Sequence, residues 1–134
     1  MTTVFVHHVR PRYAEVDMQG VVFNAHWLTY FDDTMTRFIE SLGFDTRETF
    51  LAEWDCMVVH AELDWKGSAG WEEDVAISAV PSRLGNSSFD ITFSAAVGER
   101  PACSATITYV SVRRGSPAPV PIPDEMRRRL ESRM

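Results

Sequence analysis

The stretch WLTYFDDTMTRFIESL, residues 27–42, decides the fold class. One set of its side chains recurs at three- and four-residue spacing, which is the period of a single α-helix face. Polar residues fill the opposite stripe, and Gly43 follows at a typical helix end. Because the first face is rich in aromatic residues, the pattern predicts a long helix covered by a β-sheet. The residues of that face are Trp27, Tyr30, Phe31, Thr34, Met35, Phe38, Ile39 and Leu42.

Alternating apolar and polar residues on both sides of the helix predict β-strands. One strand is expected before the helix, at residues 3–10, and residues 45–55 are expected to form a short helix or an irregular link. Pro81 marks a bulge or an edge position. The four later strands are expected at about 57–66, 74–84, 88–97 and 102–113. This order predicts an α+β fold, with a curved antiparallel five-stranded sheet wrapped around one long helix.

The size and charge of the chain narrow its function. Its 134 residues fit one domain, residues 1–134, with a C-terminal tail of about 115–134. The net charge of -6 argues against nucleic acid as a partner, because phosphate binding needs concentrated Lys and Arg. Residues 127–129, three consecutive arginines, are interpreted as a solvated helix end. With no 18-residue apolar run and no signal segment, we expect no membrane partner and a cytoplasmic location.

Cysteines and histidines give no pattern that predicts a metal or a cofactor. Cys56 and Cys103 lie in apolar stretches without metal-ligand spacing, and we expect both to be buried free thiols. His7 and His8 are adjacent, so on a strand they point to opposite faces of the sheet. The sequence therefore predicts neither a metal site nor a bound cofactor.

The loop before the helix holds the leading catalytic candidate, Asp17. Apolar neighbours such as Val16 and Met18 predict partial burial, which raises the pKa of a carboxyl and makes it a better base or nucleophile. Gly20 allows a positive φ or close approach of the backbone to a ligand. Free N–H groups near Asn24, at the helix start, suit a developing oxyanion. The alternative is that Asp17 only caps backbone donors.

The stretch RYAEVDMQGVVFNAHWLTYFD, residues 12–32, resembles the signature of the 4-hydroxybenzoyl-CoA thioesterase-like branch of the hotdog superfamily. That signature has an acidic residue followed two positions later by a second one, which is Asp. A glycine with a hydrophobic run comes next, and an aromatic residue then opens the long helix. The segments LDW at 63–65 and RLGNSSF at 83–89 resemble a later strand and turn of the same family. The resemblance spans about residues 5–113.

This resemblance implies a hotdog-fold acyl-CoA thioesterase with active sites between the protomers of a homodimer, often paired into a homotetramer. It implies that Asp17 attacks the thioester as a nucleophile or activates water as a general base, with Gly20 in the adjoining turn. The backbone N–H at Asn24 would polarise the carbonyl. Many members have His or Tyr there, so a side-chain role is not carried over. The implied partner is an acyl-CoA, with an acyl carrier protein as the alternative carrier.

Aromatic residues and histidines are the first group of substrate-binding candidates. Phe23, Trp27 and Trp65 are candidates for an acyl pocket, with core packing as the alternative. His26 is a candidate for orienting substrate, with packing or capping as the alternative. His60 shares a strand face with Glu62 and Asp64, and this face is expected to approach the partner's Asp17 loop.

The second group of substrate-binding candidates consists of side chains that can donate hydrogen bonds to anions. Arg83, Ser87 and Ser88 form a turn rich in donors that is expected to contact pantetheine or phosphate. Arg113 and Arg114 are candidates for a nucleotide phosphate in the same way. For each arginine, solvated surface is the alternative.

Competing carboxylates and functions stay open. Another hotdog branch uses a carboxylate on the long helix, so Asp32 and Asp33 are considered, although both fall on the polar stripe. A hotdog dehydratase is an alternative function, but it needs a paired His and acid, and no such signature is present. A non-catalytic acyl-thioester binding protein is the other alternative, and the presence of Asp17 argues against it.

Overall fold

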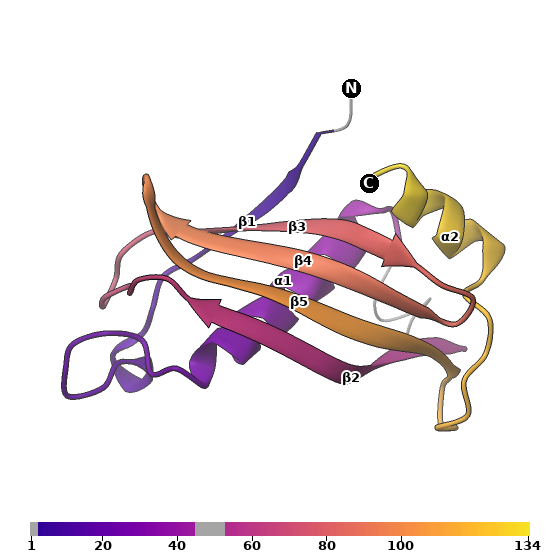
Figure 1. Ribbon diagram of the computed structural model, residues 1–134, viewed down its shortest axis with the longest axis horizontal. Coiled ribbons are helices and arrows are strands. Elements are labelled where there is room, and N and C mark those ends of the chain that lie inside the picture. Colours follow the sequence, from indigo (N-terminus) through magenta and orange to yellow (C-terminus); the bar gives the residue numbers. More distant parts are fainter. Residues whose placement is uncertain (1–2, 45–52) are drawn as a thin grey trace.

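A long helix, α1 (His26–Ser41), lies across one face of a five-stranded antiparallel sheet (Figure 1). This computed structural model describes residues 3–44 and 53–134. The strand order across the sheet is β1-β3-β4-β5-β2, and the α+β prediction is confirmed. The strands are β1 (Phe5–Val9), β2 (Trp54–Trp65), β3 (Val75–Leu84), β4 (Ser88–Val97) and β5 (Arg100–Arg113). A 3-10 turn, η1 (Tyr13–Glu15), precedes α1, and α2 (Asp124–Glu131) follows the sheet.

The core lies between α1 and the inner face of the sheet. Along β4, Phe89, Ile91 and Phe93 are fully buried and alternate with polar residues that face away from the helix. Phe31 of α1 stacks on Phe93, with ring centroids 5.2 Å apart. Burial of these side chains supplies most of the free energy that holds helix and sheet together. The helix begins and ends one residue before the predicted range 27–42, and its buried residues are those of the predicted face.

The two edges of the sheet differ in length. β1 has five residues and pairs with β3, whereas β2 has 12 residues and pairs with β5. The register of β2 shifts between Val58 and His60. Met57, Val58 and Val59 are each about half exposed, so this long edge carries apolar side chains.

The largest difference between the predicted and observed strand boundaries is at the start of β2. β2 begins at Trp54, three residues before Met57, because the buried Trp54 ring donates from Nε1 to Ser111 Oγ (2.5 Å) and its backbone aligns with the end of β5. The predicted link at 45–55 is therefore too long, and its residues 45–52 lie outside the described part of the chain. The register shift after Pro81 confirms the bulge predicted there.

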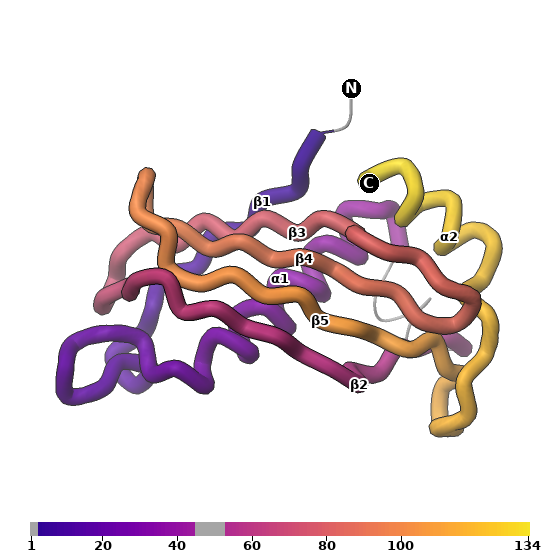
Figure 2. Tube along the Cα trace, viewed as in Figure 1, coloured from indigo at the N-terminus to yellow at the C-terminus, as the bar shows by residue number. Residues whose placement is uncertain are grey.

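The C-terminal helix is bonded to the rest of the molecule. The prediction that the three arginines form a solvated helix end is wrong for Arg127, which is partly buried, whereas Arg128 and Arg129 are exposed as predicted. Arg127 donates to the carbonyls of Gly85 and Asn86, and Arg129 donates to the Leu42 carbonyl (2.5 Å). Arg128 lies outside and pairs with Glu125. Figure 2 shows α2 beside the end of α1. The guanidiniums satisfy carbonyls that a helix end or a turn leaves without donors.

Within the described residues, no helix combines the length and the apolar character that crossing a membrane requires.

Candidate active site

The loop that carries Asp17 is a tight hairpin. Val16 and Val22 form an antiparallel bridge, and the Asp17 N–H donates to the Val21 carbonyl (2.9 Å). The Gly20 N–H donates to the Asp17 carbonyl (2.9 Å), which closes a four-residue turn. Gly20 has φ +78°, as predicted, and no atom lies within 4 Å of where its Cβ would stand. Backbone conformation, rather than space, therefore requires glycine here.

The Asp17 carboxylate is half-buried and held by one oxygen. Its Oδ1 accepts a hydrogen bond from the Gln19 N–H (2.8 Å). Oδ2 has no hydrogen bond to any residue that the structure describes. The backbone-capping alternative thus accounts for one oxygen, and the other is free to react.

The start of α1 offers a backbone donor in the same segment. Ala25 is the N-cap, the His26 N–H donates to the Phe23 carbonyl (2.9 Å), and the Trp27 N–H donates to Asn24 (3.4 Å). The backbone N–H of Asn24 itself donates to no acceptor in the described parts of the chain. Its side chain is exposed and makes no hydrogen bond there either. A free N–H at the positive end of a helix dipole suits an oxyanion.

Glu15 anchors the loop to α1, and sequence reasoning missed this role. Its buried carboxylate accepts from the Arg12 N–H (2.8 Å), the Arg12 guanidinium (3.0 Å) and the Tyr30 hydroxyl (2.9 Å). Burial pushes the pKa of Glu15 up, but these bonds together hold it below its ordinary value. Burial, followed by the bond to Glu15, raises the pKa of Tyr30. The sequence did hold one signal for this contact. Tyr30 is an aromatic residue with a hydroxyl on the apolar face of the helix, and a buried tyrosine hydroxyl usually has a hydrogen-bond partner.

The β2–β3 connection supports the other side of the hairpin. The Val22 N–H donates to the Ala69 carbonyl (2.8 Å), and Val21 bridges to Gly70. Glu73 accepts from the Gly70 N–H (2.6 Å) and pairs with Arg100 (2.9 Å). The Asp17 loop is therefore fixed at both sides, which limits the motion of its carboxylate.

A cavity of about 360 Å³ opens between the first turns of α1 and the β5–β2 edge of the sheet. Its walls are mostly apolar. The lining residues are Leu28, Thr29 and Asp32 from the helix, and Val58, Ile107 and Tyr109 from the sheet. Asp32 is exposed, as the polar stripe predicted, but it also lines this cavity. Sequence periodicity placed each residue on a face and gave no sign that the two faces enclose a space.

The architecture and the motifs match known proteins. A family model described as the thioesterase-like superfamily matches residues 11–130. This chain belongs to that superfamily. A 1,4-dihydroxy-2-naphthoyl-CoA hydrolase of Nostoc punctiforme is 24% identical over 129 residues, which cover 96% of this chain and 87% of the relative.

Solved structures confirm the hotdog fold. A 1,4-dihydroxy-2-naphthoyl-CoA thioesterase from Synechocystis superposes with a TM-score of 0.83 at 14% identity, covering 96% of each chain. A gentisyl-coenzyme A thioesterase gives a TM-score of 0.86 at 24% identity, covering 94% of this chain and 99% of that one. The resemblance found in residues 12–32 is thus confirmed at the level of family and fold.

The aromatic candidates of this superfamily member separate into core and surface. Trp27 is 1% exposed and packs edge-on against Tyr30, with centroids 5.5 Å apart, so it occupies the core, the alternative stated above. Phe23 is 48% exposed and lies edge-on to His26, with centroids 6.0 Å apart, directly before α1. Trp65 is exposed at the end of β2. Only Phe23 and His26 thus lie together next to Asn24.

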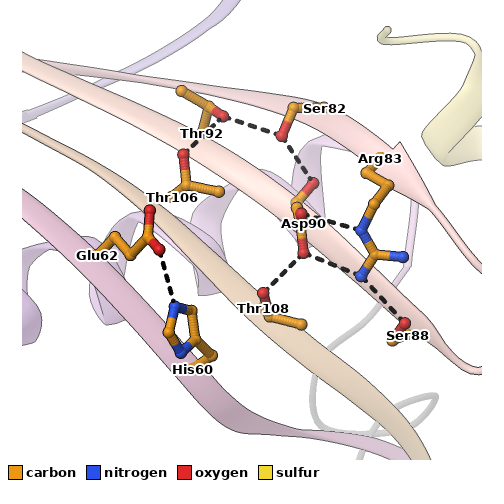
Figure 3. A network of polar contacts seen from close by, with 9 residues as sticks. All are labelled: His60, Glu62, Ser82, Arg83, Ser88, Asp90, Thr92, Thr106 and Thr108. Atoms are coloured by element: carbon orange, nitrogen blue, oxygen red, sulfur yellow. Dashed lines mark hydrogen bonds and ion pairs between the residues drawn. The ribbon is translucent and has the colours of Figure 1, made fainter.

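His60 lies on the sheet face turned away from α1 (Figure 3). It pairs in register with Thr108, whose neighbours Ile107 and Tyr109 face the helix. Its ring bonds to Glu62 (3.2 Å). Within one protomer the structure does not bring His60 to Asp17, and an approach to a partner's Asp17 stays a prediction.

The predicted anion turn is largely occupied by its own bonds (Figure 3). The Arg83 guanidinium donates to both Asp90 oxygens (3.0 and 3.1 Å) and to Ser88 Oγ (3.0 Å). The bond from Arg83 is the main reason that the pKa of Asp90 lies below its ordinary value. The Ser87 carbonyl accepts from the Ser111 N–H (2.7 Å). Arg83 therefore braces the β3–β4 hairpin, and contact with phosphate stays a prediction.

The thiols are free, as predicted. Cys103 is buried, whereas Cys56 is only partly buried. Burial raises the pKa of Cys56 to about 12 and that of Cys103 to about 11, which makes both poor nucleophiles. Within residues 3–44 and 53–134, no three His, Cys, Asp or Glu side chains are grouped as metal ligands.

Proposed function

We propose that this protein hydrolyses an acyl-CoA thioester to the free acid and CoA. One observation carries the proposal: a carboxylate held by one oxygen precedes, within seven residues, a helix start with a free backbone N–H. The relatives support the reaction class, because their names describe hydrolysis of CoA thioesters of aromatic acids. An aryl-CoA is therefore the favoured substrate, and an acyl carrier protein is the alternative carrier.

The proposed chemistry gives each group one task. In the nucleophilic route Asp17 Oδ2 attacks the thioester carbonyl, the C–S bond breaks with CoA leaving as the thiolate, and water then hydrolyses the mixed anhydride to the free acid and the Asp17 carboxylate. In the general-base route Oδ2 takes a proton from a water that attacks the carbonyl, the C–S bond breaks, and the proton passes to the CoA thiolate. In both routes the Asn24 N–H donates to the oxygen on which negative charge develops. Glu15 and Gly20 hold the loop in position. A pre-steady-state burst of CoA that precedes free acid indicates the nucleophilic route.

We propose that the active form is a homodimer joined along β2. Its 12-residue edge presents backbone N–H and C=O groups and exposed apolar side chains, including Val59. A second copy paired there would join two sheets into one and cover the cavity mouth beside Leu28 and Val58. A homotetramer of two such dimers is the proposed larger assembly. Sedimentation velocity tests this: a Val59→Lys variant should shift toward monomer, and an unchanged assembly contradicts the β2 interface.

The test of the activity is thiol release from a panel of aryl- and alkyl-CoA thioesters, followed with a thiol reagent. The wild-type protein should release CoA from at least one member. Asn24→Ala should hydrolyse it at nearly the wild-type rate, because the proposed donor is the backbone N–H. Binding of acyl-CoA without thiol release would favour a binding protein and contradict the proposal.

A further inference from the structure

Two aromatic side chains beside the Asp17 hairpin are exposed and in contact with each other. Tyr13 of η1 is 78% exposed, and Trp71 of the β2–β3 connection is 56% exposed. Their rings meet edge to face, with centroids 6.0 Å apart and planes 73° apart. A planar ring that stacks on one of them would therefore meet the other with its edge. Large aromatic groups that touch yet stay in water are typical of a binding surface.

The backbone after Trp71 is strained. Glu72 has φ +61° and is the single residue other than glycine with a positive φ in the described part of the chain. Its N–H donates to the Pro11 carbonyl (3.0 Å), which joins the turn to the segment that carries Tyr13. Side chains rarely adopt this conformation, and residues that hold it gather at functional sites.

The aromatic pair lies within reach of a substrate bound at Asp17. Asp17 pairs with Val21 inside the hairpin, and Val21 bridges to Gly70. Gly70, the residue before Trp71, is thus two strand spacings, about 10 Å, from the Asp17 backbone. The pantetheine arm of CoA is longer than this distance. A thioester whose carbonyl lies at the Asn24 N–H can therefore place its nucleotide outside the hairpin, over the two rings.

Three carboxylates follow Trp71 in the sequence, and they restrict which part of a nucleotide lies over the rings. Glu73 and Asp74 have basic partners, whereas the Glu72 carboxylate is exposed and bonds to no side chain among the described residues. Their negative charge disfavours a phosphate at this place. The uncharged base of a nucleotide therefore suits the aromatic pair.

Arg10 offers positive charge on the other side of Pro11. It is exposed and forms no hydrogen bond or ion pair with any residue that the structure describes. It lines a cavity of about 460 Å³ beside β1. Its guanidinium is free to bind phosphate oxygens. The two carboxylates that line this cavity already have partners, in the pairs Glu15–Arg12 and Asp33–His7.

We propose that Trp71 and Tyr13 bind the adenine ring of CoA and that Arg10 binds its phosphates, so that this surface selects CoA over an acyl carrier protein. An acyl carrier protein presents the same pantetheine arm without an adenine. The proposal rests on the acyl-CoA hydrolase function stated above. It adds the residues that recognise the carrier, which take no part in bond cleavage.

The test compares one acyl group on two carriers, as the best acyl-CoA of the panel and as the corresponding acyl-pantetheine. Wild type should prefer the acyl-CoA. Trp71→Ala should lower kcat/KM for the acyl-CoA about tenfold, through KM, and leave the acyl-pantetheine unchanged, which is within the range for a base stacked on an aromatic ring. Trp71→Phe keeps a ring and should retain most of the preference. Arg10→Gln should also raise KM for the acyl-CoA alone, whereas Arg128→Gln, exposed on α2, should change neither substrate.

Adenosine 3′,5′-bisphosphate, which carries no thioester, tests the same site without hydrolysis. Calorimetry should show that it binds wild type and that Trp71→Ala raises its Kd about tenfold. Sedimentation velocity of Trp71→Ala should give the wild-type assembly. A shift toward monomer would show that the rings form a subunit interface and would contradict the proposal.

The outcomes separate this inference from the proposed function. If wild type hydrolyses the acyl-CoA and the acyl-pantetheine equally well, or if Trp71→Ala lowers kcat/KM for both alike, the adenine site is wrong and the hydrolase function stands. If wild type releases CoA from no thioester of the panel but binds the bisphosphate through Trp71, the hydrolase function fails and the adenine site stands.

Discussion

Replacing Glu15 with alanine tests whether the Asp17 loop is held by its anchor on α1. The Tyr30 hydroxyl, in a residue 5% exposed, would lose its acceptor, at a cost of about 1–3 kcal/mol. The bond from the Arg12 N–H contributes about 0.5–1.5 kcal/mol more. The Arg12 guanidinium adds little, because its side chain is 80% exposed. We therefore expect Glu15→Ala to lower the free energy of unfolding by about 2–4 kcal/mol.

The assay is urea denaturation at a fixed protomer concentration, since assembly would otherwise shift the midpoint. Glu15→Gln keeps an acceptor oxygen for Tyr30 and should lose about half as much. The pKa of Glu15 is lower in the folded protein than in the unfolded chain. Its ionised form therefore stabilises the fold above the unfolded pKa, near 4.3, and this contribution is lost as the pH falls through the folded pKa. The difference between wild type and Glu15→Gln should be constant near neutral pH and shrink under acid conditions.

Two results would refute this reasoning about the anchor. A loss below about 0.5 kcal/mol for Glu15→Ala would show that the three bonds contribute no net stability. Additive effects of Glu15→Ala and Tyr30→Phe would show that the two side chains do not act as a pair. If the anchor fixes the loop, kcat of Glu15→Ala should also fall, while Glu131→Ala, at the exposed end of α2, should keep wild-type turnover.

Three further substitutions test the turn, the C-terminal helix and the core. Gly20→Ala forces a positive φ on alanine, so Tm should drop by an amount equivalent to about 1 kcal/mol. CoA release should also slow, because the Asp17 turn shifts. An unchanged Tm would contradict the described turn. Arg129→Ala removes the donor to the Leu42 carbonyl and should lower the free energy of unfolding, measured with urea, by about 1–2 kcal/mol. The control Arg128→Ala should leave this free energy unchanged, because Arg128 pairs only with Glu125 on the same helix. Equal effects of the two substitutions would contradict the described contact. Phe31→Ala should lose about 3–5 kcal/mol in the same assay, because Phe31 is fully buried, and a loss under 1 kcal/mol would place it outside the core.

Periodicity was enough to predict the fold because both of its signals are local. The buried face of α1 and the alternation of Phe89, Ile91 and Phe93 each follow from the backbone repeat of one element. The positive φ of Gly20 also follows from local turn chemistry. The family resemblance then related the Asp17 loop to the start of α1.

The parts that the sequence did not predict depend on contacts between distant segments. Arg129 bonds to Leu42, 87 residues away, and a run of arginines beside glutamates looks like any exposed helix end. Glu15 meets Tyr30 across 15 residues, and an acidic loop residue gives no sign of burial. The cavity beside Tyr109 exists only once helix and sheet are joined.

The most direct measurement of the central claim is single-turnover hydrolysis of the best acyl-CoA by Asp17→Asn. The amide oxygen can still accept the Gln19 N–H, so fold and substrate binding should be retained, as checked by Tm and Kd. We predict a rate lower by about 10²–10⁴-fold, the scale for a positioned acid–base group. Asp124→Asn, at the exposed start of α2, is the matched control and should keep the wild-type rate. Hydrolysis by Asp17→Asn at the wild-type rate would contradict the account.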